Sequence, residues 1–182
     1  MLNATRLLAA CAAFGLMLSG CGGGGQKAAP PARTSARPAP AAAVAPAIPA
    51  ADYVSSASAL DLYVIKASEL ALHRSQALRV REVAERLIAA HRGSSAQLSL
   101  NGRRLNLLPS ATVGPRLQAF LEQLNSSVSF DRDYAAQMKR AEQEAVAIHR
   151  SYEARGASPT LVPVARALAP IMEQQQRLVS YL

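Results

Sequence analysis

The sequence has 182 residues and a formal net charge of +8, with 20 lysines and arginines against 12 acidic residues. This length fits one domain with an additional segment, and after the N-terminal region no run approaches the roughly 20 apolar residues that a membrane-spanning helix needs. So basic a chain suggests nucleic acid as a partner. However, aromatic residues make up only 4% and tryptophan is absent, so the aromatic platform on which bases stack is missing, and we expect no nucleic-acid binding.

Residues 1–20 have the pattern of a secretory signal. Arg6 gives a positive start, and an apolar run follows from Leu7 to Leu18. The run leads into Leu18-Ser19-Gly20-Cys21, which resembles the lipobox of bacterial lipoproteins, where the cysteine is lipidated and becomes the first mature residue. The resemblance implies a lipid anchor on Cys21. Because Gly22 follows rather than aspartate, it also implies sorting to the outer membrane, with the domain facing the periplasm.

A second cysteine fits the same four-residue pattern, in Leu8-Ala9-Ala10-Cys11. Cleavage there would leave an apolar segment too short for a signal and would expose a hydrophobic mature end. We therefore expect lipidation at Cys21 and discard of Cys11 with the signal. The alternative is a signal in which the cysteine occurs by chance, or an uncleaved anchor. With Cys21 as the only mature cysteine, no disulfide forms within the mature chain.

Residues 21–51 are expected to be the lipidated cysteine and a disordered tether. The segment is rich in Gly, Pro and Ala and has no aromatic residue, no acid and no helical apolar stripe, so it cannot bury a core. Pro-rich chain favours an extended geometry of about 3.1 Å per residue, which gives a reach on the order of 90 Å. The tether is either a spacer that holds the domain off the membrane or a linker with no length requirement.

Residues 52–182 show helical apolar spacing nearly throughout, and no run alternates with period two over the length of a strand. The pattern predicts a first helix over 53–74 and a second over 76–100, with Ser75 as the N-cap of the second. Asn101-Gly102 ends the second helix, and Pro115 begins a short third helix that reaches about Asn125.

A fourth helix is predicted between Ser129, its cap, and Gly156. Ser158-Pro159 is expected to start a fifth, in which Pro170 should cause a kink or a split. Four long amphipathic helices and one short one predict an all-α helical bundle. The apolar stripes of the first, second, fourth and fifth helices are, in turn, Val54, Ala57, Leu60, Val64, Ala67, Ala71; Val80, Ala84, Leu87, His91, Ser94, Leu98; Phe130, Tyr134, Met138, Ala141, Ala145, Ile148, Tyr152; and Leu161, Ala165, Leu168, Met172, Gln175, Val179, Leu182.

Four short motifs of this region share their order and spacing with a known family. They are Leu70-Ala71-Leu72; Val83-Ala84-Glu85-Arg86-Leu87 leading to His91; Phe130-Asp131-Arg132-Asp133-Tyr134 followed by Met138; and Leu168-Ala169-Pro170. With them, residues 52–182 resemble the domain of unknown function 4142 family of small exported bacterial proteins. The resemblance implies a ferritin-like four-helix bundle with an extra short helix and a place in the cell envelope. It implies no particular reaction.

The family often carries an acid in the first helix, Asp-His in the second, and a histidine in each of the last two long helices. The matching positions here are Val64, Ala90-His91, Glu142 and Gln175, so only His91 is an imidazole. Because His91 and Gln175 lie on apolar stripes, we expect them to pair with each other, with Glu142 or with trapped water in a buried polar cluster. The alternatives are a weak metal site in a degenerate ferritin-like protein that handles metal or redox chemistry, or side chains that face solvent.

No sequence pattern points to catalysis. The chain has no Glu-x-x-His and no His-x-x-x-His pair for a metal, no Gly-x-Ser-x-Gly for a nucleophile and no phosphate-binding glycine loop before a helix. We therefore expect no cofactor, no stoichiometric metal and no enzymatic activity. His73, at the end of the first helix, is expected in solvent.

Positive charge gathers in residues 74–104, where seven arginines face two glutamates. Arginine pairs well with carboxylates and phosphates, so anionic envelope components are candidate partners. The alternative is a solvated helix face. The sequence thus favours a membrane-anchored envelope lipoprotein with a non-enzymatic binding or structural bundle. The candidate anionic contacts are Arg79, Arg81, Arg86, Arg92, Arg103 and Arg104.

Overall fold

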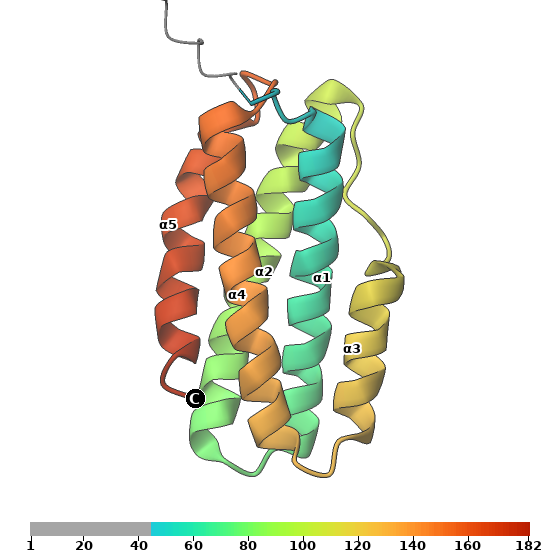
Figure 1. The fold of residues 1–182 in the computed structure, drawn as a ribbon, viewed down its shortest axis with the longest axis vertical. Coiled ribbons are helices and arrows are strands. Elements are labelled where there is room, and N and C mark those ends of the chain that lie inside the picture. Colours follow the sequence, from blue (N-terminus) through green and yellow to red (C-terminus); the bar gives the residue numbers. More distant parts are fainter. Residues whose placement is uncertain (1–44) are drawn as a thin grey trace, which may run out of the picture. The chain divides into compact units, whose positions relative to one another are not determined.

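The computed structural model describes residues 45–182, and within them the chain is all-α (Figure 1). Helices α1, α2, α4 and α5 form a four-helix bundle in which α1 packs on α2 and α4, and α5 completes the bundle by packing on α2 and α4. Helix α3 lies outside this bundle, against α1 and α4. The ferritin-like bundle with an extra short helix is therefore confirmed. The helices are α1 (Ala50–Arg74), α2 (Leu78–Gly102), α3 (Gly114–Ser126), α4 (Phe130–Arg155) and α5 (Val162–Val179), with a 3-10 turn η1 (Arg103–Leu105) after α2.

The turn between α1 and α2 corrects one predicted cap. Ser75 ends α1 rather than starting α2, and its hydroxyl accepts a hydrogen bond from the backbone N–H of Ala77 at 3.2 Å. Helix α2 then begins at Leu78 with no side-chain cap. The prediction that Ser75 caps the second helix is wrong because a serine side chain satisfies a tight turn as readily as a helix terminus.

Helix α4 begins at Phe130, as predicted, but not through the predicted cap. The Ser129 side chain makes no capping hydrogen bond. Ser127 organises this end instead: its hydroxyl donates to Asp133 Oδ2 at 2.6 Å and accepts from the Ser129 backbone N–H at 3.0 Å. Asp131 and Asp133 lie in the first turn, where carboxylates favour the helix dipole.

The predicted start of the fifth helix at Ser158-Pro159 is also wrong. The carbonyl of Ser158 accepts hydrogen bonds from Leu161 and Val162, which makes a separate turn, and α5 begins at Val162. The helix continues through Pro170 without splitting. Pro170 and Arg166, the residue four positions before it, are both exposed, so the backbone carbonyl that proline leaves without a donor lies on the water-facing side.

The hydrophobic core follows the predicted stripes. Every stripe residue of α1 and α2 is buried, as are those of α4 and α5 except Ile148 and Leu182, which are partly exposed. Met138, in the middle of α4, has no exposed surface. Helical periodicity thus predicted which faces of the four long helices meet.

The segment before α1 is fastened to the end of α4. The backbone N–H of Ile48 donates to the carbonyl of Arg155 at 2.8 Å, and the N–H of Ala157 donates back to Ile48 at 2.9 Å. Below this contact the rings of Tyr53 and Tyr152 stack with centroids 3.9 Å apart. The packed structure therefore begins at Ile48, ahead of residue 52. No helix among the described residues is long and apolar enough to cross a membrane.

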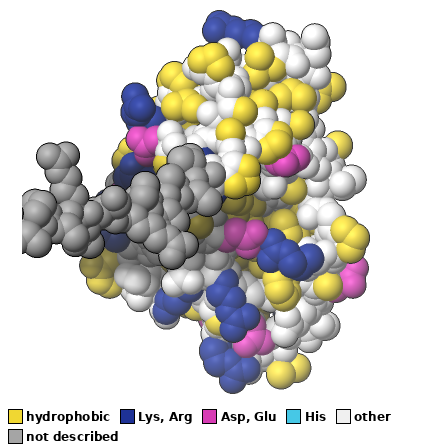
Figure 2. All heavy atoms as spheres, turned by 45° about the horizontal axis from the view of Figure 1, so that its top comes forward, with side chains coloured by type: hydrophobic (Ala, Val, Ile, Leu, Met, Phe, Trp, Pro, Cys, Tyr) yellow, Lys and Arg dark blue, Asp and Glu magenta, His cyan; other side chains and the backbone are white. Residues whose placement is uncertain are grey.

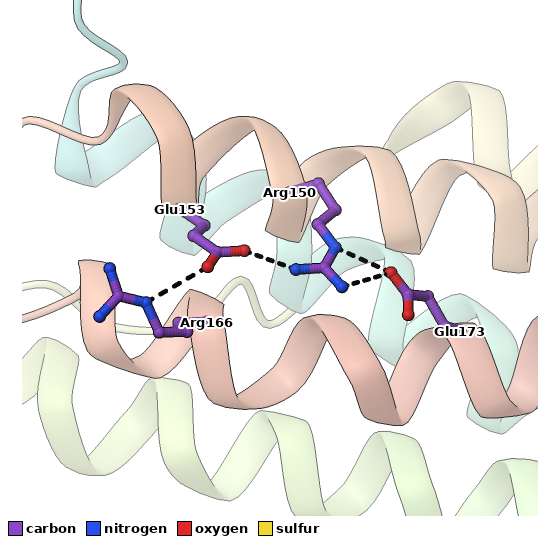
Figure 3. A network of polar contacts seen from close by, with 4 residues as sticks. All are labelled: Arg150, Glu153, Arg166 and Glu173. Carbon is purple, nitrogen blue, oxygen red and sulfur yellow. Dashed lines mark hydrogen bonds and ion pairs between the residues drawn. The ribbon is translucent and has the colours of Figure 1, made fainter.

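An ion-pair network joins α4 to α5 on the surface (Figure 3). The Arg150 guanidinium donates to Glu173 at 2.6 and 2.8 Å and to Glu153 at 2.8 Å, and Arg166 donates to the other oxygen of Glu153 at 3.2 Å. Water screens exposed ion pairs of this kind, so they add little to stability. The network fixes the register of the two helices more than it stabilises the fold.

Candidate functional site

One imidazole connects three helices at the centre of the bundle. His91 on α2 lies with its Nδ1 atom 2.7 Å from Asp61 Oδ1 of α1 and its Nε2 atom 2.9 Å from Glu142 Oε1 of α4. All three residues are buried. The hydroxyl of Ser95 donates to the second oxygen of Asp61 at 3.2 Å. The polar cluster therefore has His91 at its centre and a carboxylate on each ring nitrogen.

The two carboxylates keep His91 in its charged form. Burial alone would lower the pKa of His91, but the charge of Glu142 and the hydrogen bonds to Asp61 and Glu142 outweigh this effect and raise the pKa to about 10. At neutral pH both ring nitrogens therefore carry protons and donate to a carboxylate. His91 is an imidazolium cation in the core, paired with a carboxylate on each side.

This geometry leaves the cluster few chemical options. A metal needs a ring nitrogen with a free lone pair, and both nitrogens of His91 already face carboxylates. Within the described residues no group of histidine, cysteine, aspartate and glutamate side chains is arranged to hold a metal ion. Ser95 donates to Asp61 rather than to His91, so its hydroxyl is not paired with an imidazole as it is in a Ser-His-Asp triad. The arrangement is suited to holding three helices in register.

Gln175 does not join the hydrogen bonds of this cluster. The structure brings His91 and Glu142 together, as expected, but no hydrogen bond among the described residues links Gln175 to either of them. The carbonyl oxygen of Gln175, the second oxygen of Glu142 and the hydroxyl of Ser94 are buried without a hydrogen-bond partner within residues 45–182.

Sequence reasoning missed Asp61. The acid of the first helix was expected near Val64, but Val64 packs in the core and Asp61, one turn earlier, supplies the carboxylate. A signal was present, because Asp61 is the only charged residue between Asp52 and Lys66 and lies beside the apolar stripe. Asp61 was missed because charged residues are usually expected to face solvent.

A second buried histidine, His149, has the opposite charge state. Burial lowers the pKa of His149 to about 4, so the ring is neutral at pH 7. Its Nδ1 atom lies 2.9 Å from the hydroxyl of Tyr53, and the two groups share a hydrogen bond. The predicted stripe of α4 included Ile148 instead, which is only partly buried. Exposed His73 lies where it was expected, at the end of α1.

The six candidate arginines do not form one surface. Arg81 donates to the backbone carbonyl of Leu72 and so closes the end of α1, and Arg92 pairs with Glu69 at 2.8 Å. The other four are exposed, but they extend from the start of α2 to η1, about 35 Å apart along the helix. Figure 2 likewise shows Lys and Arg side chains scattered over the visible face, several beside acidic ones. The four are Arg79, Arg86, Arg103 and Arg104.

The predicted lipidation site, Cys21, and the signal before it lie outside the described residues, as does most of the tether. Their assignment rests on the sequence alone.

A pocket of about 430 Å³ opens between α1, α3 and α4. Tyr63 forms part of its wall, and the Tyr63 hydroxyl donates to Gln137 at 2.7 Å. The pocket is separate from the His91 cluster, because neither Asp61, His91 nor Glu142 lines it.

Comparison with known proteins gives a family and a fold. The profile described as "Domain of unknown function (DUF4142)" matches residues 34–182. Among solved structures, the crystal structure of a DUF305 fragment from Deinococcus radiodurans is similar, with a TM-score of 0.63, 20% sequence identity, and coverage of 75% of this chain and 96% of that one. At this identity the likeness concerns the fold alone. No curated protein sequence matches.

Proposed function

The chain belongs to the domain of unknown function 4142 family, and from that premise we propose that it is a lipid-anchored protein of the bacterial cell envelope whose bundle binds or supports rather than catalyses. The observation that carries this proposal is Leu18-Ser19-Gly20-Cys21 directly after an apolar run. Lipid on Cys21 attaches the mature chain to the membrane. With Gly22 next to it, the anchor belongs in the outer membrane, with the bundle in the periplasm.

The composition of the segment between Cys21 and the bundle supports a domain held by a lipid anchor. The family profile matches from residue 34, and the packed structure begins at Ile48, so more than twenty residues rich in Gly, Pro and Ala separate Cys21 from the bundle. Such a segment gives the bundle freedom to reach partners at a distance from the bilayer.

The non-enzymatic role is supported by the interior of the bundle. Asp61, His91 and Glu142 form a buried cluster of titratable groups, and each ring nitrogen of His91 is held by a carboxylate. A general base needs a free nitrogen within reach of a substrate. The cluster is also fully buried, so substrate has no access to it.

Paired cysteine variants test the anchor. We expect Cys21→Ala, expressed in a bacterium with a lipoprotein pathway, to lose palmitate labelling and to leave the membrane fraction. Cys11→Ala is the matched control, since it changes the other cysteine of the same signal, and it should label and fractionate as the parent does.

Two results would refute the anchor. One is a Cys21→Ala protein that still labels with palmitate. The other is loss of labelling in Cys11→Ala but not in Cys21→Ala, which would move the lipid to the earlier cysteine.

A further inference from the structure

Helix α3 is an addition to the four-helix bundle and is attached through few buried side chains. Of its thirteen residues only Leu117 and Leu124 are buried. Polar contacts complete the attachment: Arg116 pairs with Glu144 of α4 at 2.6 Å, and Gln137 of α4 donates to the backbone carbonyl of Phe120 at 3.2 Å. Arg74 of α1 also donates to the backbone carbonyls of Leu124 and Asn125 at the end of α3. The helix is thus held by two buried leucines and by polar contacts at its start, middle and end.

The pocket of about 430 Å³ fills the space that α3 leaves against α1 and α4. This volume is in the range of small-molecule sites, which are generally apolar with a few polar groups that orient the ligand. Apolar side chains come from all three helices, and polar ones gather on α3 and α4. The apolar lining residues are Leu60, Tyr63, Leu117, Phe120, Ala136 and Ala141.

The charged groups of the pocket leave one cation without a partner. Glu144 is paired with Arg116, and Asp133 accepts hydrogen bonds from Ser127 and Arg132. Arg140 lines the pocket, is exposed, and makes no hydrogen bond or ion pair among the described residues. An apolar wall with one uncompensated guanidinium matches a ligand that has an apolar chain and one negative charge.

We propose that this pocket binds a small amphipathic carboxylate, with its apolar chain against Leu117 and Phe120 and its carboxylate on Arg140. A guanidinium binds a carboxylate through two parallel N–H donors. The carboxylates of Asp133 and Glu144 also line the pocket and repel a dianion, which favours a carboxylate over a phosphate monoester. This proposal does not depend on the lipid anchor.

Binding is measured by isothermal titration calorimetry at pH 7.5 on the mature chain with Cys21→Ser, using octanoate, 1-octanol and octyl phosphate as probes. We expect octanoate to bind at one site per chain and about fivefold more tightly than octanol, the preference that a partly exposed charge pair gives. Octyl phosphate should bind more weakly than octanoate.

Two variants assign the site to the pocket. Arg140→Gln should remove the preference for octanoate over octanol while leaving octanol binding unchanged. Ala136→Trp places a large side chain in the pocket from an exposed position and should weaken both ligands at least tenfold. The matched controls are Arg79→Gln and Ala167→Trp. They change the same residue types at exposed helix positions that line none of the described pockets. Both control variants should bind octanoate and octanol as the parent does.

The site can also be located in the parent protein, so that the assignment does not depend on the folding of a variant. Intermolecular nuclear Overhauser effects should connect the octanoate chain to Leu117 and Phe120. The proposal is overturned if octanoate does not bind, if octanol or octyl phosphate binds as tightly, if Arg140→Gln and Arg79→Gln behave alike, or if the contacts map to another face.

Discussion

Asp61 Oδ1 lies 2.7 Å from His91 Nδ1, and this contact joins α1 to α2 inside the core. Because Glu142 contacts the other ring nitrogen, one side chain connects three of the four bundle helices. A buried charge of this kind is stable only while its partners remain in place. The cluster therefore selects one register of the helices, and its contribution can be measured by removing its parts separately and together.

Removing the cation alone should be costly. His91→Ala leaves the carboxylates of Asp61 and Glu142 buried without their partner, and we expect the free energy of unfolding to fall by about 3–5 kcal/mol in urea denaturation. Replacing all three residues by leucine should cost less than His91→Ala, because no charge then remains in the core. A triple variant less stable than the single one would contradict this account of the cluster.

Raising the pH should weaken the fold through His91. The pKa of His91 is about 10 in the folded chain. Below pH 6.5 His91 is protonated in both the unfolded and the folded chain, and its ion pairs contribute fully to the free energy of unfolding. Between these values only the unfolded chain releases the proton, so the free energy of unfolding falls by about 1.4 kcal/mol per pH unit. From pH 7 to 9 the parent should lose about 3 kcal/mol. His91→Gln should show a flat profile there, and an equal slope in both proteins would assign the effect to another group.

Lowering the pH should weaken the fold through His149. Above pH 6.5 both states are neutral, but in the folded chain burial lowers the pKa of His149 to about 4. As the pH falls from 6.5 toward 4, the unfolded chain takes up the proton first, and the free energy of unfolding decreases. We expect the parent to lose about 2 kcal/mol more than His149→Gln between pH 7 and 5. The two proteins would lose stability in parallel if His149 were protonated in the fold.

The sequence predicted the bundle better than its connections. Every residue of the predicted stripes of α1 and α2 is buried, because burial of an apolar face imposes a period that the chain must follow. The stripes did not include Tyr53, Tyr63, Val83 and Ile88, which are buried beside them. The cap at Ser75 was misassigned because a serine hydroxyl serves turns and helix ends equally well. At Ser158 the backbone carbonyl, not the hydroxyl, closes a turn ahead of α5.

The polar cluster was predictable only in part. His91 and Glu142 were expected together because His91 lies on an apolar stripe and both residues match positions of the family pattern. Asp61 was not expected, since an acid is buried only where a partner from another helix faces it, and one helix's periodicity cannot reveal that partner.

Metal content separates the structural cluster from a metal centre. We expect the mature chain, purified and dialysed, to contain no stoichiometric iron, zinc, copper or manganese by elemental mass spectrometry, because each nitrogen of His91 is held by a carboxylate. Added metal should raise the melting temperature little. One metal per chain that is lost on His91→Ala or Glu142→Ala would instead favour a metal-handling protein.

The lipid anchor is tested most directly by the mass of the N-terminal peptide of the protein extracted from bacterial membranes with detergent. The account predicts a peptide that begins at Cys21 and carries the added mass of a lipidated cysteine, with residues 1–20 absent. An unmodified Cys21, or a mature chain that begins elsewhere, would contradict it.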